Sequence, residues 1–266
     1  MEDKNSPLGL PAAEAGVGVK KIRVGIVNYM NTLPLLYGLQ KPPIADLIEL
    51  SGDYPAKVAE KLKKGEIDVG LIPVAVIPEL PSYHIVGSHC IGTEGEIASV
   101  ALFSEVPMNE IKKVYLDYQS RTSVVLLKFL MREYWGISPE IIPATGEDYR
   151  KEIKGTTGGL VIGDRALEQR KVSTFIYDLG SEWRKITGLP FVFAAWVSIK
   201  PLPDDFIRLF DSGNAVGLNH IDEIVTATPY DLYDLKKYYS LHLSYDLDEA
   251  KQKGMNHFLR VIKEIL

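Results

Sequence analysis

The stretch that decides the predicted fold runs Gly25-Ile26-Val27-Asn28-Tyr29-Met30-Asn31-Thr32-Leu33-Pro34-Leu35. An apolar run of strand length, Ile22 to Val27, breaks into polar residues and then into a helix start. Asn31 or Thr32 can cap that helix, and Pro34 suits its first turn because the missing N–H would have had no partner. The amide donors of such a turn point past the carboxyl end of the strand, where parallel α/β sheets bind ligands. The stretch therefore predicts the floor of a binding cleft, although an ordinary capped strand-to-helix connection has the same pattern.

Composition and charge are those of a globular protein. The 266 residues are 46% hydrophobic and 24% charged, values that predict a buried core. Lys and Arg number 30 against 35 Asp and Glu, and a net charge of -5 gives no reason to expect a nucleic-acid or membrane-surface partner. An anionic ligand must therefore be held by local donors.

Targeting signals and cysteine usage favour the cytoplasm. Residues 1–20 lack an apolar core of signal-peptide length, and we expect them to form a disordered leader. The single cysteine, Cys90, cannot form an internal disulfide, which fits a reducing compartment. No window approaches the roughly 18 apolar residues of a membrane span. The sequence thus predicts a cytoplasmic protein with no membrane partner.

Apolar runs and helical patterns alternate after the opening strand. The sequence predicts a strand over Ile44 to Leu50, a helix over Tyr54 to Lys64 that stops at Gly65, and a strand over Ile67 to Ile72. Alternation at this pace is typical of an α/β fold with a parallel sheet and right-handed crossovers.

A second set of α/β units begins near residue 111. Lys113 to Leu116 reads as a strand, and Val124 to Trp135 reads as a helix with Tyr134 on its buried face. The long runs Ile97 to Phe103, with Ser99 in its middle, and Phe191 to Ile199 bracket this second set. Both runs are long enough to cross between two lobes as hinge strands.

Such hinge strands predict a two-lobed architecture with the ligand cleft between the lobes. Lobe 1 would contain residues 21–100 and 197–266, and lobe 2 would contain residues 101–196. A single sheet with helical additions explains the same pattern, and the sequence alone does not choose between them.

The segment Ser120-Arg121-Thr122-Ser123 carries the best local chemistry in the chain. Three hydroxyls, a guanidinium and the amides of a helix N-terminus suit a carboxylate or a phosphate. A well-capped helix with an exposed Arg is the structural alternative. Asp164 follows a buried strand at a position where cleft residues emerge, although it could simply cap the next helix.

The histidines give no sign of a metal site. The chain has five, and none falls between residues 101 and 196; they are His84, His89, His220, His242 and His257. No pair has the spacing of a helical zinc site. We therefore predict neither a metal nor a cofactor.

Several of these segments, taken in order, resemble a known family. The segments are residues 24–35, the run Gly65-Glu66-Ile67-Asp68-Val69-Gly70-Leu71-Ile72-Pro73, the Ser99-Val100 pair, Ser120 to Ser123, and Leu189-Pro190-Phe191-Val192-Phe193-Ala194-Ala195-Trp196. Together they resemble the chorismate dehydratase of the futalosine route to menaquinone, from about residue 21 to the C-terminus. Met30 stands where the family pattern has Leu.

The resemblance implies a periplasmic-binding-protein type II fold that works as an enzyme, a hydro-lyase. The reaction would remove water from chorismate, a small dianion, to leave 3-[(1-carboxyvinyl)oxy]benzoate. The resemblance also implies the site residues: Asn31 and Ser99 as catalytic, and Tyr29, Thr32, Ser120, Arg121, Thr122, Ser123, Asp164 and Trp196 as substrate-binding. The oligomeric state is left open.

Three alternatives remain at this stage. We hypothesise that the catalytic base is a carboxylate, either the substrate's own enolpyruvyl group or Asp164. A sister enzyme of the pathway, the 1,4-dihydroxy-6-naphthoate synthase, carries a histidine motif in its second lobe, where this chain reads Ile162-Gly163-Asp164. A solute-binding protein of the same fold, without catalysis, is the other competing class.

Overall fold

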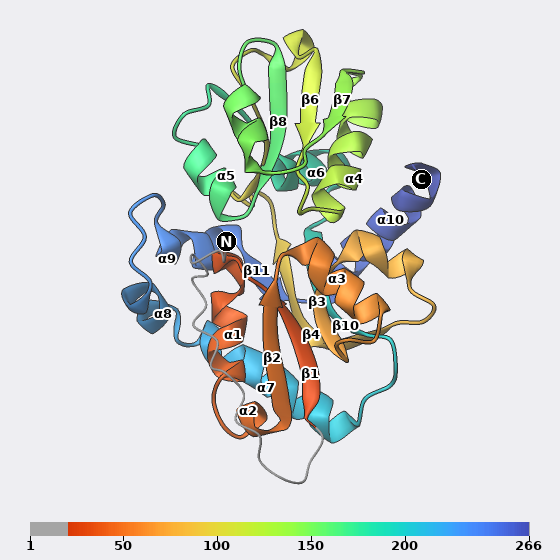
Figure 1. Cartoon of the computed structure of the whole chain (residues 1–266), viewed down its shortest axis with the longest axis vertical. Helices are drawn as coiled ribbons and strands as arrows, with labels where there is room; N and C mark the ends of the chain where they lie inside the picture. Colours follow the sequence, from red (N-terminus) through yellow and green to blue (C-terminus); the bar gives the residue numbers. More distant parts are fainter. Residues whose placement is uncertain (1–20, 266) are drawn as a thin grey trace. The chain divides into compact units, whose positions relative to one another are not determined.

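The computed structural model describes residues 21–265, in which two mixed β-sheets are flanked by helices (Figure 1). Residues 1–20, the predicted leader, lie outside the described residues. Contacts divide the described chain into unit 1, residues 21–91 and 194–229, and unit 2, residues 92–193 and 230–265. The α/β fold class predicted from the sequence is confirmed.

The first sheet has six strands in the order β11-β4-β10-β3-β1-β2. β1 pairs in parallel with β2 and β3, as predicted, while β10 runs antiparallel to β3 and makes the sheet mixed. The strands are β1 Ile22–Val27, β2 Ile48–Asp53, β3 Val69–Pro73, β4 His84–Thr93, β10 Phe191–Ser198 and β11 Ser244–Asp246.

Helices α1 and α7 pack so closely in unit 1 that only glycine fits between their backbones. A Cβ added to Gly217 would lie 1.7 Å from the carbonyl oxygen of Pro34, and one added to Gly38 would lie 1.9 Å from that of Gly213. The unit-1 helices are α1 Leu33–Leu39, α2 Ile44–Leu47, α3 Pro55–Lys63, α7 Asp204–Leu218 and α8 Ile221–Ala227. The contact anchors α1, which follows the Asn31 turn, to a segment far away in sequence.

One predicted strand of unit 1 is wrong in its first half. Residues Ile44–Leu47 form the short helix α2, and the strand starts only at Ile48. Ile44 is buried near Gly213 of α7, so its apolar side chain serves helix packing instead of the sheet. The helix predicted up to Gly65 is confirmed, and Gly65 has the positive φ of 68° that such a stop requires.

The second sheet, in unit 2, has the order β7-β6-β8-β5-β9. β6 is parallel to β7 and β8, whereas β5 is antiparallel to β8 and β9. The strands are β5 Val100–Ser104, β6 Lys113–Leu116, β7 Glu140–Pro143, β8 Thr157–Ile162 and β9 Phe175–Asp178. The helices are α4 Thr122–Phe129, α5 Asp164–Gln169, α6 Leu179–Thr187, α9 Leu235–Lys237 and α10 Glu249–Ile265.

Helix α4 changes its winding halfway along the predicted helix. It continues as a π-helix over Leu130–Trp135 and ends at Gly136, whose φ is 61°. The wider turn rotates the following side chains around the axis. Tyr134 is therefore 46% exposed, and its predicted place on the buried face is wrong.

The C-terminal segment groups with unit 2, whereas the sequence assigned it to lobe 1. Phe258 of α10 packs edge-on against Trp183 and Phe191, with ring centroids 5.9 and 4.9 Å apart. This aromatic cluster ties α10 to the second unit. The division between units also crosses β4 rather than the run Ile97 to Phe103, and it crosses β10 within the predicted second run. The ligand cleft between lobes stays a prediction.

Substitution of Gly217 by Ala should destabilise the protein strongly, by about 2 kcal/mol or more, because the added methyl overlaps the Pro34 carbonyl. Urea unfolding of the wild type and the variant measures this difference. Gly146→Ala is the matched control, since a Cβ there meets nothing within 4 Å and the residue has an extended φ of -173°. Equal losses for both variants would contradict the close contact.

Candidate functional site

In unit 1, the turn after β1 is held by Thr32. Its Oγ1 lies 2.7 Å from the carbonyl oxygen of Val27 and 2.8 Å from that of Tyr29. The side chain is wholly buried and has a single hydroxyl proton, so backbone oxygens take the donor that a substrate anion would need. Thr32 therefore shapes the turn, and its predicted contact with substrate stays a prediction. Tyr29 and Asn31 lie on the same turn with partly exposed side chains.

Trp196 is a core residue of unit 1. Its indole Nε1 donates to Asn214 Oδ1 at 3.0 Å, and its ring packs edge-on against Phe210. The side chain has no exposed surface, and its one polar atom is already bonded. Trp196 therefore serves packing in unit 1, and its predicted contact with substrate stays a prediction.

In unit 2, α4 begins within the segment Ser120 to Ser123, as predicted. The hydroxyl groups of this segment make different hydrogen bonds. Ser120 Oγ accepts from the N–H of Ser123 at 3.1 Å and so caps the helix. Thr122 Oγ1 donates to the carbonyl oxygen of Phe193 at 3.0 Å, and its predicted contact with substrate stays a prediction. Arg121 is exposed, and no acceptor among residues 21–265 takes its guanidinium or the Ser120 proton. These groups remain suited to an anion.

A buried ionic network lies behind this segment. The Asp117 carboxylate accepts from Tyr149 Oη at 2.7 Å and from the N–H of Gln119 at 2.8 Å, and it pairs with Arg165 Nη2 at 2.9 Å. Arg165 also donates to Gln119 Oε1 at 2.8 Å. The network fixes the loop that leads to Arg121. Sequence reasoning missed Asp117 and Arg165, although an Asp directly after a predicted strand was a usable signal.

Ser99 lies in a strained turn before β5, not in the middle of a strand as the sequence predicted. Ala98 has a φ of 62°, and the N–H of Ser99 bonds the carbonyl oxygen of Ile97 at 2.8 Å, which together form a γ-turn. A non-glycine residue in this region is costly and persists only where its surroundings hold it. The turn aims the Ser99 side chain independently of the alternation along β5.

The Asp178 carboxylate holds that turn. It accepts from the N–H groups of Ile97 at 3.1 Å and Ala98 at 2.9 Å, and from Ser181 at 3.1 Å. Arg170 donates to the Ala98 carbonyl at 3.0 Å and lies 3.6 Å from the carboxylate. Burial raises the pKa of Asp178 to about 6, although the hydrogen bonds and Arg170 act in the opposite direction.

Ser99 and Asp164 come together in unit 2. The N–H of Gly163 donates to the Ser99 carbonyl at 2.8 Å, and Asp164 is the next residue, at the start of α5. Ser99 Oγ also lies 2.7 Å from Tyr238 Oη. Burial raises the pKa of Tyr238 and of Tyr239, and the charge of Asp164 adds to both shifts. The sequence predicted Ser99 and Asp164 but gave no motif for the tyrosines.

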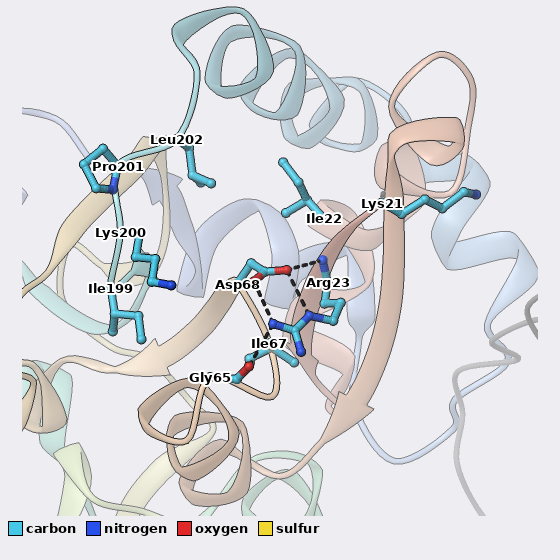
Figure 2. A pocket seen from close by; sticks show the side chains of 10 residues that line it. All are labelled: Lys21, Ile22, Arg23, Gly65, Ile67, Asp68, Ile199, Lys200, Pro201 and Leu202. Atoms are coloured by element: carbon cyan, nitrogen blue, oxygen red, sulfur yellow. Dashed lines mark hydrogen bonds and ion pairs between the residues drawn. The ribbon is translucent and has the colours of Figure 1, made fainter. Parts of the chain in front are cut away.

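A cavity of about 280 Å³ in unit 1 lies elsewhere (Figure 2). It is lined by Lys21, Ile22, Arg23, Gly65, Ile67, Asp68 and residues 199–202. Figure 2 shows the Arg23 guanidinium turned toward Asp68, at 2.7 Å, and toward the Gly65 carbonyl, at 2.8 Å. The cavity adjoins the first residues of β1, whereas Asn31 lies four residues beyond the last residue of that strand, Val27. It contains none of the predicted site residues.

Residues 21–265 contain no group of three or more His, Cys, Asp or Glu side chains placed to hold a metal ion. None of the helices described there is long and apolar enough to cross a membrane.

Solved structures define the class of fold. A protein from Archaeoglobus fulgidus matches with a TM-score of 0.73 at 14% identity, covering 92% of this chain and 97% of that one. A Candida albicans protein described as having the generic periplasmic binding protein fold matches with a TM-score of 0.63 at 12% identity, covering 92% and 91%. The periplasmic aliphatic sulphonate binding protein of Escherichia coli matches with a TM-score of 0.57 at 11% identity, covering 93% of each. The chain thus has a periplasmic-binding-protein-like α/β fold, as predicted.

Sequence comparison narrows this class to one family. A family model for menaquinone biosynthesis matches residues 22–264, and the chain belongs to that family. A curated chorismate dehydratase of Thermus thermophilus is 25% identical over 262 residues, covering 90% of this chain and 94% of the relative. A second, from Campylobacter jejuni, is 23% identical over 248 residues, covering 91% and 97%.

Asp178 should make the stability of the protein depend on pH. Its folded pKa of about 6 exceeds the ordinary value, so its contribution is full at low pH and is lost as the pH rises through 6. Between pH 5 and pH 7.5, the wild type should lose about 1 kcal/mol of unfolding free energy relative to Asp178→Asn, which has no such proton. Urea unfolding of both proteins at the two pH values measures this, and parallel pH profiles would refute the raised pKa.

Proposed function

We propose that this protein is a chorismate dehydratase that acts in menaquinone biosynthesis. The observation that carries the proposal is similarity over nearly the whole length to two curated chorismate dehydratases, together with the family match. The fold alone would not decide this, because the same architecture serves binding proteins.

The proposed reaction is an elimination that makes the ring aromatic. A proton leaves the ring carbon that bears the enolpyruvyl ether, and its C–H electrons form the new ring double bond. The neighbouring carbon loses hydroxide, which takes up one proton to become water. No electrons leave the molecule, so no oxidant is required. The product is 3-[(1-carboxyvinyl)oxy]benzoate, and aromatisation supplies the driving force.

The protein's part in this reaction is to orient a dianion and to stabilise charge as it develops. Asn31 and Ser99 are the proposed catalytic residues, since each is a neutral side chain able to donate a hydrogen bond. Arg121 and Ser120 retain available donors and are proposed to hold a carboxylate, with Ser123 beside them. Tyr29 is retained as a proposed binding residue because it shares the Asn31 turn.

The base is proposed to be a carboxylate, and two candidates stay open. One is the substrate's own enolpyruvyl carboxylate. The other is Asp164, whose side chain adjoins a cluster of tyrosines, with Tyr230 Oη 3.4 Å from its backbone carbonyl. Burial raises the pKa of Tyr230 and of Tyr239 and the charge of Asp164 adds to both shifts, so its carboxylate lies near these hydroxyls and merits a direct test.

The first test mixes purified protein with chorismate, without added metal or cofactor, and follows the ultraviolet spectrum and product mass. We expect loss of one water and an aromatic product. Asn31→Ala and Ser99→Ala should each lower kcat/KM by about 100-fold or more, as for other preorganised donors. The exposed Asn219→Ala and Ser212→Ala are matched controls and should stay near wild type. Full activity of both site variants would contradict the assigned roles.

The second test separates the two candidate bases. If the substrate carboxylate is the base, Asp164→Asn should keep kcat within about tenfold of the wild type; if Asp164 is the base, kcat should fall by about 1,000-fold or more. Steady-state kinetics gives the answer, and Asp148→Asn is the control, because Asp148 is an exposed carboxylate whose ion pair is with Lys151.

A solute-binding protein is the competing class. If chorismate or another anion raises the melting temperature while no product forms, the function is binding and the dehydratase proposal is wrong.

A further inference from the structure

The contact between Tyr238 and Ser99 is the most enclosed hydroxyl pair in the predicted site. The two oxygens lie 2.7 Å apart, the Tyr238 side chain has no exposed surface, and Ser99 is 1% exposed. Bulk water therefore does not compete for the bond between these two hydroxyls. The residues are 139 positions apart in the chain, so tertiary structure alone creates the pair.

Chemistry decides which hydroxyl donates. A phenol is a stronger acid than an alcohol, and the alcohol oxygen is the better acceptor, so Tyr238 donates and Ser99 accepts. Burial raises the pKa of Tyr238 well above its ordinary value, which keeps the phenol protonated and able to donate. The proton of Ser99 is then directed elsewhere, and none of residues 21–265 accepts it.

Both hydroxyls are held in place. The γ-turn, clamped by Asp178, fixes Ser99, and its carbonyl is bonded to the N–H of Gly163. Tyr238 begins the π-helix Tyr238–His242, and its ring packs against those of Tyr233 and Tyr239, with centroids 6.2 and 5.7 Å away. Neither side chain can turn away while these contacts persist.

We propose that Tyr238 is a positioning residue that makes Ser99 a dedicated hydrogen-bond donor toward the substrate. Hydrogen-bonded hydroxyls polarise one another, so a Ser99 that accepts from Tyr238 donates more strongly to a substrate oxygen. The same bond lowers the basicity of Ser99, which removes it as a candidate base and leaves that task to a carboxylate. This inference rests on the proposed dehydratase function.

A double-mutant cycle tests the proposal. Tyr238→Phe keeps the ring and removes only the hydroxyl; it should lower kcat by about 10- to 100-fold and leave KM within about threefold. In the Ser99→Ala background, the same change should cost less than about twofold, because the hydroxyl acts only through Ser99. Tyr233→Phe is the matched control: its hydroxyl bonds His242 at 3.0 Å, and its loss should leave kcat within about twofold.

A second variant guards against misfolding of Tyr238→Phe. Incorporation of 3-fluorotyrosine at position 238 retains a more acidic phenol and should keep kcat within about threefold of the wild type. The role of Tyr238 would be wrong if the two substitutions lowered kcat independently and additively, or if Tyr238→Phe left kcat unchanged. Turnover of chorismate by the wild type would still support the proposed function in that case. A wild type that forms no product from chorismate would overturn both.

Discussion

The hydrogen bonds of the buried Asp178 carboxylate hold the part of the proposed site that lies in unit 2, the turn that carries Ser99. The carboxylate joins the end of β9 and the start of α6 to the turn before β5, by accepting from Ser181 and from Ile97 and Ala98. Without it, Ala98 would have little reason to keep a positive φ, and Ser99 would follow the regular alternation of the strand. The desolvation of the Asp178 carboxylate therefore costs free energy, and in return the direction of the Ser99 hydroxyl is fixed.

Much of the fold could be read from the sequence where a mainly apolar run lies between turn residues. Ile22–Val27 and Lys113–Leu116 are strands with the predicted limits, because such short runs have few other solutions. The predicted strand is wrong at Ile44, because an apolar residue buried against a helix gives the same sequence pattern as one buried in a sheet. The predicted burial of Tyr134 is wrong as well, because the helical spacing of apolar residues does not indicate where a π-helix begins.

The site was predictable to the extent that it is local. Turn and cap chemistry marked the Asn31 turn and the Ser120 segment, since hydroxyls near a helix start have a definite function. The same chemistry could not show that backbone oxygens already take the protons of Thr32 and Thr122. The role of Tyr238 could not be predicted for a related reason. Its contact with Ser99 depends on packing between residues far apart in the chain, and no local motif of a single sequence indicates such a contact.

The glycine contact between α1 and α7 has a consequence for synthesis of the chain. Gly38 leaves the ribosome long before Gly213 and Gly217, and β3 precedes its antiparallel neighbour β10 by more than 100 residues. The first unit therefore cannot close its core until about 180 further residues have been made, a gap that spans the whole of residues 92–193. Its early strands and helices must persist in the nascent chain with apolar faces uncovered, which makes the N-terminal segment the part most in need of protection from aggregation.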